Sequence, residues 1–265
     1  MDLQIGGRVA IITGASDGMG WATARLLAQE GVRLVLSDVK TDTLEREVAT
    51  LGGEAIAVKA DVTSQAEVDA LVAAAVERFG TVDIVVHTAG ITGAKGDPLE
   101  MTDADYEEAY RTDFLSAVRM ARAAVPVMKR GGWGRFVCVA SENVVQPYWE
   151  EATYNTAKAA LAVFMKGLSY KLAADGVLVN TVAPAFIATP MTDEMMKKRA
   201  EEKGVSFDEA IESFLEEERP GIVQKRRGEA EEVAAVIALL VSERASFVNG
   251  ANMRVDGGSV QAVQN

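Results

Sequence analysis

Short runs of apolar residues recur along the chain at the length of buried β-strands. Two of them, Val9–Ile12 and Ile84–Val86, are apolar at every position, which is typical of strands that a parallel sheet buries on both faces. Segments of helical length separate the runs. The pattern predicts seven strands: Val9–Thr13, Arg33–Asp38, Glu54–Lys59, Asp83–His87, Gly134–Ala140, Val177–Val182 and Asn252–Val255.

The segments between the predicted strands carry helix signals. Gly18–Glu30 places apolar residues on one face and is followed by Gly31, a residue suited to end a helix. Ser64 and Glu67 have the spacing of a capping box at the start of another helix. Strands that alternate with helices need crossover connections, which give parallel pairing with helices on both faces. We therefore expect an α/β fold with a Rossmann-type, doubly wound parallel sheet of about seven strands.

No linker rich in Pro, Gly or Ser and no repeat of fixed period divides the sequence, so we expect residues 1–265 to form a single domain. The alternation is interrupted at Thr192–Arg219 by polar helical sequence, with a second capping box at Ser206 and Glu209. An insertion at this place in an α/β sheet lies near the ligand crevice, and we interpret residues 188–228 as a helical lid. A solvated helical excursion explains the same pattern equally well.

Composition and charge narrow the class of protein. Lys and Arg total 27 and Asp and Glu total 39, a formal charge of −12, which disfavours a nucleic-acid partner. No apolar run approaches the roughly 18 residues of a membrane span, and Met1–Gln4 does not begin a secretory signal, so we expect a cytoplasmic protein. One Cys and one His leave no internal disulfide and no metal-ligand cluster.

A glycine-rich turn, Thr13–Gly20, joins the first predicted strand to the first predicted helix. Glycines let a ligand approach the backbone, and the helix N-terminus offers free N–H groups and a partial positive charge. The turn therefore predicts a dinucleotide pyrophosphate site. Asp38, at the end of the second strand, can accept hydrogen bonds from ribose hydroxyls and repel a 2′-phosphate, and Asp17 acts in the same direction. We expect NAD rather than NADP, with Asp61 beside the adenine.

The same turn matches a second motif. Gly14–Gly18 has the Gly-x-Ser-x-Gly pattern of a hydrolase nucleophile elbow, with Ser16 as the nucleophile. A hydrolase of that type needs a histidine late in the chain, whereas His87 is the single histidine and lies early. The pattern therefore favours the dinucleotide site.

A second group of reactive residues follows the fifth predicted strand. Tyr154 and Lys158 are four positions apart, so on a helix they share one face, and Ser141 lies thirteen positions before Tyr154. An ammonium beside a phenol favours the phenolate, so we expect the pKa of Tyr154 to be lowered. Such a phenol can exchange a proton with an alcohol or a carbonyl, and Ser141 can stabilise charge on the same oxygen. A Tyr/Lys pair alone is usually an ordinary helix face.

From Gly7 to Gly258 the chain resembles the classical short-chain dehydrogenase/reductase family. The resemblance is carried by the glycine loop, Ser141, Tyr154, Lys158, Pro184–Pro190 and Val255–Gly258. It implies hydride transfer between NAD(P) and a secondary alcohol or ketone. In that scheme Tyr154 is the acid/base, Ser141 the partner of the substrate oxygen and Lys158 the residue that binds the nicotinamide ribose.

The resemblance also implies a set of cofactor contacts. Thr189 and the backbone of Ile187 would hold the carboxamide, and the backbone of Val62 and Gly90 would contact adenine and ribose. The full expected set is Gly14, Ser16, Asp17, Gly18, Met19, Gly20, Asp38, Asp61, Val62, Thr88, Ala89, Gly90, Tyr154, Lys158, Pro184, Ile187 and Thr189.

Three positions depart from the family pattern. Asp113 stands where the family usually has an asparagine that holds a water of a proton relay, so we include Asp113 among the catalytic residues and expect it to bind Lys158. Thr88 replaces the asparagine of an Asn-Ala-Gly turn, and Ala185 replaces a glycine.

Substrate contacts are also inferred from the resemblance. Besides Ser141, we expect the pocket to be lined by Asn143, Gln146, Tyr148, Trp149, Phe186 and Met191. These residues would give a fairly apolar cavity for a cyclic or medium-sized carbonyl compound. Loop aromatics can equally serve as subunit contacts. His87 ends a predicted strand, and we expect it to pack beside the cofactor or to be hydrogen-bonded in the core. Cys138 lies within a predicted strand and is expected to be a small apolar core residue.

The sequence thus predicts an NAD-dependent oxidoreductase that interconverts a secondary alcohol and a ketone, with small-molecule substrates and no metal. One alternative is a 3-oxoacyl-thioester reductase whose carrier phosphate meets the basic clusters Lys197–Arg199 and Lys225–Arg227, although these can simply pair with nearby acids. Another is a non-catalytic NAD(H) sensor. The helix around Tyr106–Met128 and the helix that carries Tyr154 would, by family analogy, pack in a homotetramer or homodimer.

Overall fold

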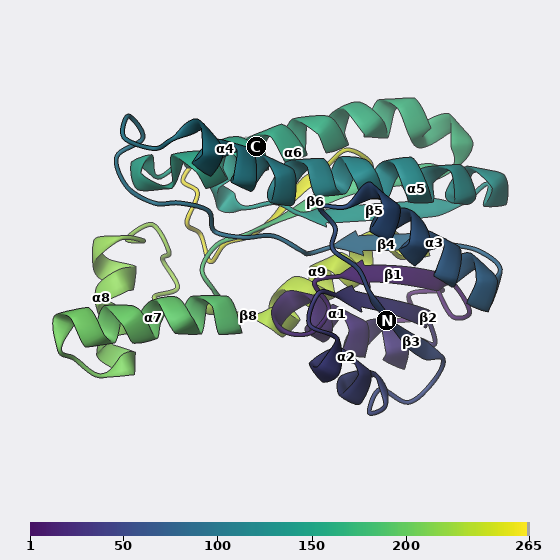
Figure 1. Ribbon diagram of the computed structural model, residues 1–265, viewed down its shortest axis with the longest axis horizontal. Helices are drawn as coiled ribbons and strands as arrows, with labels where there is room; N and C mark the ends of the chain where they lie inside the picture. The colour runs from purple at the N-terminus through teal and green to yellow at the C-terminus, as the bar shows by residue number, and fades with distance from the viewer. Residues whose placement is uncertain (264–265) are drawn as a thin grey trace.

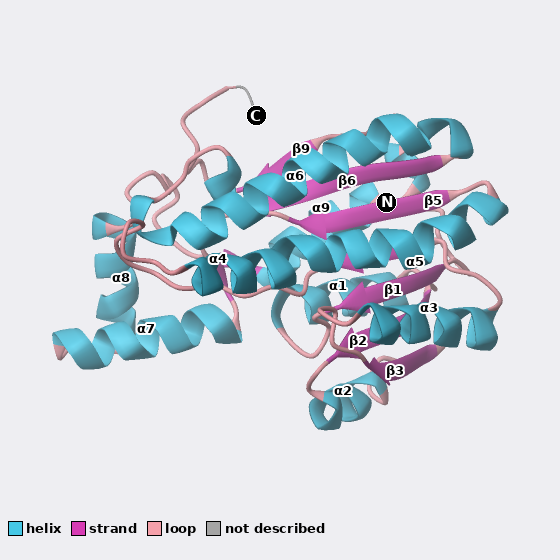
Figure 2. Cartoon of the chain, turned by 45° about the horizontal axis from the view of Figure 1, so that its top comes forward, coloured by secondary structure: helices cyan, strands magenta, loops and turns pink. Residues whose placement is uncertain are grey.

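The computed structural model describes residues 1–263; the last two residues of the predicted domain lie outside it. Its centre is a parallel sheet of seven strands in the order β3-β2-β1-β4-β5-β6-β9 (Figure 2). The strands are β1 (Val9–Thr13), β2 (Arg33–Asp38), β3 (Ala55–Lys59), β4 (Ile84–His87), β5 (Gly134–Val139), β6 (Val177–Pro184) and β9 (Asn252–Val255). The predicted strand number and parallel pairing are confirmed, and the predicted bounds differ by at most two residues.

Helices cover both faces of the sheet (Figure 1). Ala10 and Ile12 of β1 pack in one core with α1 and α9, whereas Ile11 packs in the other with α3, α5 and α6. This alternation explains why every position of β1 is apolar. The helices are α1 (Gly18–Gln29), α2 (Thr41–Val48), α3 (Gln65–Phe79), α4 (Asp103–Ala109), α5 (Leu115–Gly131), α6 (Ala152–Leu172), α7 (Pro190–Lys203), α8 (Phe207–Glu217) and α9 (Ala230–Leu240).

The long helix expected around Tyr106–Met128 is not continuous. A π-helical turn at Tyr110–Phe114 separates α4 from α5. Such a turn widens the helix by one residue and is common at functional sites. Here it contains Asp113, which is 1% exposed.

Helix ends follow the predicted signals with one exception. Ser206 and Glu209 form the expected capping box of α8. Ser64 accepts from the N–H of Glu67 at the start of α3, but the carboxylate of Glu67 accepts from the N–H of Asp61 at 2.9 Å. The second half of that capping box is therefore absent, because a neighbouring backbone donor takes its place.

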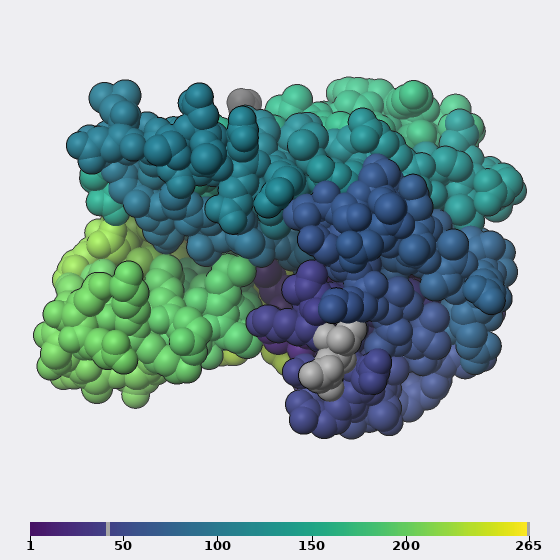
Figure 3. Space-filling model, viewed as in Figure 1, coloured from purple at the N-terminus to yellow at the C-terminus, as the bar shows by residue number. Residues whose placement is uncertain are grey.

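The predicted lid segment, residues 188–228, lies beyond the carboxyl ends of the strands (Figure 1). It contains α7 and α8, and a short parallel pair that sequence reasoning missed, β7 (Ile187–Ala188) with β8 (Gly228–Glu229), fixes its two ends. Phe186 and Ile222 pack with Met196, Phe214 and Leu215 in a separate small core. In Figure 3 this green segment borders a hollow beside the purple N-terminal part.

Among the described residues no helix has the length and apolar character needed to span a lipid bilayer.

Candidate active site

The loop between β1 and α1 has the geometry of a phosphate cradle. Gly14 and Gly18 adopt φ of +62° and +51°, which other residues rarely adopt. A Cβ on Gly20 would lie 2.2 Å from the carbonyl oxygen of Gly14, so the helix can approach the loop only with glycine there. No side chain caps α1. Its first N–H groups therefore remain free to bind an anion.

A groove of about 560 Å³ runs along this loop and across the ends of β2, β3 and β4. It brings together most of the expected cofactor residues: Gly14, Ser16, Asp17, Gly18, Met19, Gly20, Asp38, Asp61, Val62, Thr88, Ala89, Gly90 and Thr189. Lys40 also lines the groove, although sequence reasoning did not select it. The glycine loop, the free helix N-terminus and the acidic β2 end fit a dinucleotide.

Asp38 is held in place by the glycine loop. Its Oδ2 accepts from Ser16 through the backbone N–H at 3.2 Å and through the hydroxyl at 2.8 Å, and its Oδ1 accepts from the N–H of Lys40. Partial burial and the neighbouring Asp38 raise the pKa of Asp17, against the opposing effect of Lys40. Hydrogen bonds from Thr63 lower the pKa of Asp61.

The departure at Thr88 is accommodated by the fold. Its hydroxyl donates to the carbonyl oxygen of Thr13 at 2.6 Å and so ties β4 to the glycine loop. Ala185 does not adopt a left-handed backbone, so its Cβ causes no strain there.

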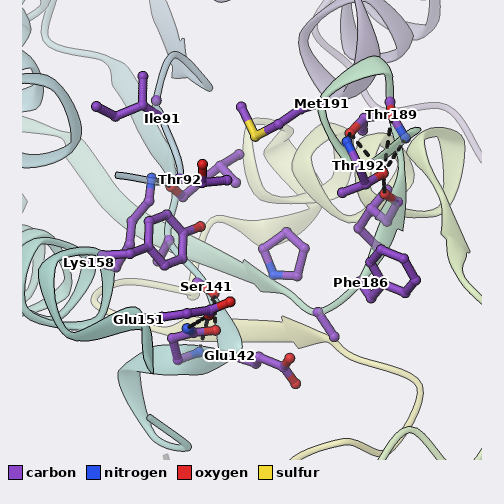
Figure 4. A pocket seen from close by; sticks show the side chains of 18 of the residues that line it. Ile91, Thr92, Ser141, Glu142, Glu151, Lys158, Phe186, Thr189, Met191 and Thr192 are labelled. Atoms are coloured by element: carbon purple, nitrogen blue, oxygen red, sulfur yellow. Dashed lines mark hydrogen bonds between the residues drawn. The ribbon is translucent and has the colours of Figure 1, made fainter. Parts of the chain in front are cut away.

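Ser141, Tyr154 and Lys158 line one cavity. Figure 4 labels Ser141 and Lys158 among the residues that line it. Ser141 follows β5 and caps a 3₁₀ turn at Glu142–Val144, while Tyr154 and Lys158 lie one turn apart at the start of α6. The Lys158 ammonium donates to the carbonyl oxygen of Val139 at 3.1 Å and lies 5.5 Å from the centre of the Tyr154 ring. The predicted juxtaposition is thus present.

The expected lowering of the Tyr154 pKa is wrong for this structure. Burial raises the pKa of Tyr154 and outweighs the lowering effect of Lys158, and the negative charge of Asp113 raises it further. A hydrogen bond with Ser141 lowers it but does not reverse the result. At neutral pH the phenol therefore holds its proton.

Asp113 does bind Lys158, as the sequence predicts. Its Oδ1 lies 3.2 Å from the Lys158 ammonium and accepts from the N–H of Ile91 at 3.1 Å. Its Oδ2 is buried and has no hydrogen-bond partner among the described residues. Burial raises the pKa of Asp113, although Lys158 opposes that shift. The pKa of Lys158 is raised because Asp113 and Tyr154 together outweigh the lowering effect of burial.

The cavity above these residues has a volume of about 160 Å³ and adjoins the groove, since Met19, Thr88, Gly90 and Thr189 line both. Tyr154, Lys158, Pro184 and Ile187 of the expected cofactor set lie on the cavity side. A dinucleotide in the groove would therefore present its nicotinamide end to the cavity.

The expected substrate residues divide into two groups. Ser141, Asn143, Phe186 and Met191 line the cavity, whereas Gln146, Tyr148 and Trp149 do not. Trp149 begins a 3₁₀ turn and is 67% exposed. The ring of Tyr148 is instead covered by the guanidinium of Arg219, whose carbon lies 3.5 Å from the ring centre.

Sequence reasoning missed four charged residues of the cavity lining: Lys95, Glu142, Glu151 and Arg219. The expectation of a fairly apolar cavity is therefore only half right, since these charged residues line it together with the apolar side chains Met191, Met195 and Phe214. Burial raises the pKa of Glu142 against the effect of contacts with Ser259 and Arg219. The pKa of Glu151 is lowered, because Arg219 and Lys95 together outweigh its burial.

His87 and Cys138 are core residues, as expected. His87 is 1% exposed, and its ring lies 2.8 Å from both the Thr13 and the Ser116 hydroxyls. Because the Ser116 hydroxyl donates to the carbonyl oxygen of Thr112, Nε2 of His87 must donate to Ser116 and Nδ1 must accept from Thr13. Cys138 is fully buried.

Five of the six residues in the two basic clusters of the lid segment pair with acids, whereas Lys225 donates to the carbonyl oxygen of Pro220. Lys197 pairs with Glu194, Lys198 with Glu202 and Arg199 with Glu217. Arg226 pairs with Glu232 and Arg227 with Asp193. These pairs match the interpretation that the basic clusters pair with nearby acids and do not bind a carrier phosphate.

The chain is similar over almost its whole length to known oxidoreductases. A family model described as enoyl-(acyl carrier protein) reductase matches residues 14–260. L-sorbose reductase from Gluconobacter frateurii, solved with NADPH and L-sorbose, has a TM-score of 0.93 at 35% identity and covers 99% of this chain and 100% of its own.

Levodione reductase from Leifsonia aquatica is 32% identical over 96% of this chain and 95% of its own. The 7alpha-hydroxysteroid dehydrogenase of Escherichia coli K12 is 30% identical over 98% of this chain and 97% of its own. The protein belongs to the short-chain dehydrogenase/reductase family. It is an enzyme of the NAD(P)-dependent type that acts on alcohol or carbonyl groups. This result does not support the hydrolase or the sensor interpretation.

Proposed function

We propose that this enzyme is an NAD-dependent oxidoreductase that interconverts a secondary alcohol and a ketone, with Tyr154 as the acid/base. The observation that carries the proposal is the single cavity that joins Ser141, Tyr154 and Lys158 to the dinucleotide groove. The bound nicotinamide supplies the hydride acceptor or donor. In the reductive direction, the Tyr154 phenol donates its proton to the carbonyl oxygen and the Ser141 hydroxyl stabilises charge there.

The sorbose reductase structure holds NADPH, but residues of this chain favour NAD. The Asp38 carboxylate is fixed by two hydrogen bonds from Ser16 at the place expected for the ribose hydroxyls. A fixed negative charge there favours a ribose with a free 2′-hydroxyl over one with a 2′-phosphate. The positive charge of Lys40 would attract a 2′-phosphate, but Lys40 is exposed, so water and salt screen this attraction.

The substrate we propose is a small hydroxylated ketone or the corresponding polyol. Glu142, Glu151, Asn143 and Arg219 give one wall of the cavity many hydrogen-bonding groups. Most of these groups are bonded to one another, but Glu142 Oε2 is buried without a hydrogen-bond partner among the described residues, and a hydroxylated compound can donate to it. The similarity to L-sorbose reductase supports the same class.

The 3-oxoacyl-thioester reductase is the second candidate. The description of the matching family model names the acyl carrier protein that such an enzyme would use, although the enoyl reduction it names is a different reaction. The paired state of Lys197–Arg199 and of Arg226 and Arg227 weighs against a free phosphate site on the lid segment. Acetoacetyl-coenzyme A would be reduced well by such an enzyme.

The deciding experiment measures NADH and NADPH absorbance with four substrate classes: ketoses and polyols, simple secondary alcohols, hydroxysteroids and acetoacetyl-coenzyme A. We expect the highest kcat/KM for a ketose or polyol with NAD(H). Preferential reduction of the thioester would select the second candidate. Absence of turnover with all four classes and both cofactors would contradict the proposal.

We also propose that residues 188–228 act as the lid of a single domain, and that the enzyme assembles as a homotetramer or homodimer through α5 and α6. Val163 and Tyr170 of α6 are 74% and 75% exposed in one chain, as an interface helix requires. Light scattering on the purified protein tests the assembly, and a monomeric mass would contradict it.

A further inference from the structure

The hydroxyl of Ser141 is held by Asn143. Ser141 Oγ donates to Asn143 Oδ1 at 2.9 Å and accepts from the N–H of Asn143 at 3.2 Å. An amide side chain can hold a serine in this way only if its oxygen, and not its nitrogen, faces the hydroxyl proton. The orientation of the Asn143 amide therefore decides how Ser141 is presented to a substrate.

Glu151 fixes that orientation. The Nδ2 of Asn143 donates to Glu151 Oε2 at 2.7 Å and to Asn155 Oδ1 at 2.8 Å. Both partners are acceptors, so a flipped amide would place its oxygen against a carboxylate. Asn155 is itself tied to the carbonyl oxygen of Tyr148 at 2.7 Å.

The other oxygen of Glu151 is bound from the lid segment and from the loop after β4. Glu151 Oε1 accepts from Arg219 Nη2 at 2.9 Å and from Lys95 Nζ at 2.7 Å. Glu151 and Arg219 are each 8% exposed, so water screens their ion pair little.

Arg219 brings the lid segment into this network. It follows α8, stacks on the ring of Tyr148 and lies 3.7 Å from Glu142 through its Nε. Its planar guanidinium can stack and bind a carboxylate at once, which a lysine cannot do. A continuous chain of contacts thus runs from Arg219 through Glu151 and Asn143 to Ser141.

We propose that Glu151 is a positioning residue for the reaction, which docks the lid segment through Arg219 and, through Asn143, holds the Ser141 oxygen in place for the substrate. The inference rests on the proposed function for its kinetic part. When a ketone enters, the Ser141 proton turns from Asn143 Oδ1 to the carbonyl oxygen, while the amide keeps the serine oxygen in place. Without Glu151, only Asn155 opposes a flip of the Asn143 amide, and the lid segment loses one of its anchors.

The kinetic test compares Glu151→Gln with Glu150→Gln, a control at an exposed neighbouring glutamate. We expect kcat to fall about tenfold or more in Glu151→Gln, less than the roughly 100-fold or greater loss expected for Ser141→Ala. The dissociation constant of NADH should stay within about twofold of the wild-type value in both glutamate variants.

Combining the two substitutions shows whether Glu151 acts through Ser141. If it does, Ser141→Ala with Glu151→Gln is no slower than Ser141→Ala alone. Multiplicative losses, or a kcat of Glu151→Gln equal to that of the control, would overturn the proposal. Arg219→Met removes the contact of the lid segment with Glu151. Should Glu151→Gln fail to fold, the same kinetic comparison is made with Arg219→Met.

Hydrogen exchange tests the docking without any turnover. Amides of residues 207–219 should exchange several-fold faster in Glu151→Gln and in Arg219→Met than in wild type, while Glu150→Gln leaves them unchanged. Equal exchange in all four proteins would overturn the docking, whatever the substrate proves to be. If the proposed function is wrong, the wild-type protein will show no turnover, but the two variants will still exchange faster than wild type in residues 207–219.

Discussion

The ammonium of Lys158 lies 3.2 Å from Oδ1 of Asp113, and both side chains are at most 5% exposed. The Asp113 carboxylate thus neutralises part of the Lys158 charge, which would otherwise lower the pKa of Tyr154 further. Its own negative charge also raises the pKa of Tyr154. Burial and the charge of Asp113 therefore both favour the protonated phenol, which suits Tyr154 to act as an acid.

Substituting Asp113→Asn should move the pH dependence of alcohol oxidation toward neutral pH. Oxidation needs the phenolate of Tyr154, so kcat rises with pH through the Tyr154 pKa. The substitution removes a charge that raises this pKa, and the rising limb should then appear at lower pH. Initial rates of NADH formation between pH 6 and 10 measure the effect.

Reduction provides the control for that experiment. It needs the protonated phenol, so the falling limb of the reduction profile should move to lower pH in the same variant. A pair of profiles that coincide with those of the wild type would show that Asp113 does not influence the reacting proton.

Substituting Asp38→Ser should relax the preference for NAD⁺. The variant loses charge-assisted hydrogen bonds to the ribose worth about 1.5–3 kcal/mol, so kcat/KM for NAD⁺ should fall about 10-fold to 100-fold. The same variant no longer repels a 2′-phosphate, and kcat/KM for NADP⁺ should rise. Ser16→Ala leaves the carboxylate in place and should have a smaller effect; equal use of both cofactors by wild type would refute the role of Asp38.

His87 should make the protein less stable toward acid. Burial lowers the pKa of His87 to about 3, whereas an unfolded histidine titrates near 6.5. As pH falls through this window the unfolded chain binds a proton that the folded chain does not. The free energy of unfolding should therefore fall by about 1.4 kcal/mol per pH unit because of this group, and it is fully retained only above about pH 6.5.

Urea unfolding at pH 6.5 and pH 5.0 measures this contribution, with His87→Gln as the matched variant. Wild type should lose ~2 kcal/mol more than the variant over that interval. Since the chain has one histidine, its imidazole resonances offer a direct check. A titration midpoint near pH 6.5 in the folded protein would refute the buried neutral ring.

The strands and the reactive residues were predictable because their signals are local. A strand such as β1 is apolar at each position because cores lie on both sides of it. The glycine loop needs its residues within one turn, and Tyr154 and Lys158 share a helix face through their spacing alone.

The charged wall of the cavity was not predictable because its contacts join distant parts of the chain. Arg219 meets Glu151 across 68 positions, and each residue alone looks like a member of an exposed charge run. The raised pKa of Tyr154 also depends on burial, which spacing does not reveal. Trp149 was misplaced because a 3₁₀ turn before α6 points it toward solvent.

Replacement of the Tyr154 phenol by a phenyl ring, Tyr154→Phe, tests the central claim most directly. The variant keeps the groove and should bind NADH with near wild-type affinity, measured by fluorescence titration. Hydride transfer should be lost, because no group is left to exchange the proton with the substrate oxygen. Turnover equal to that of the wild type in this variant would contradict the account.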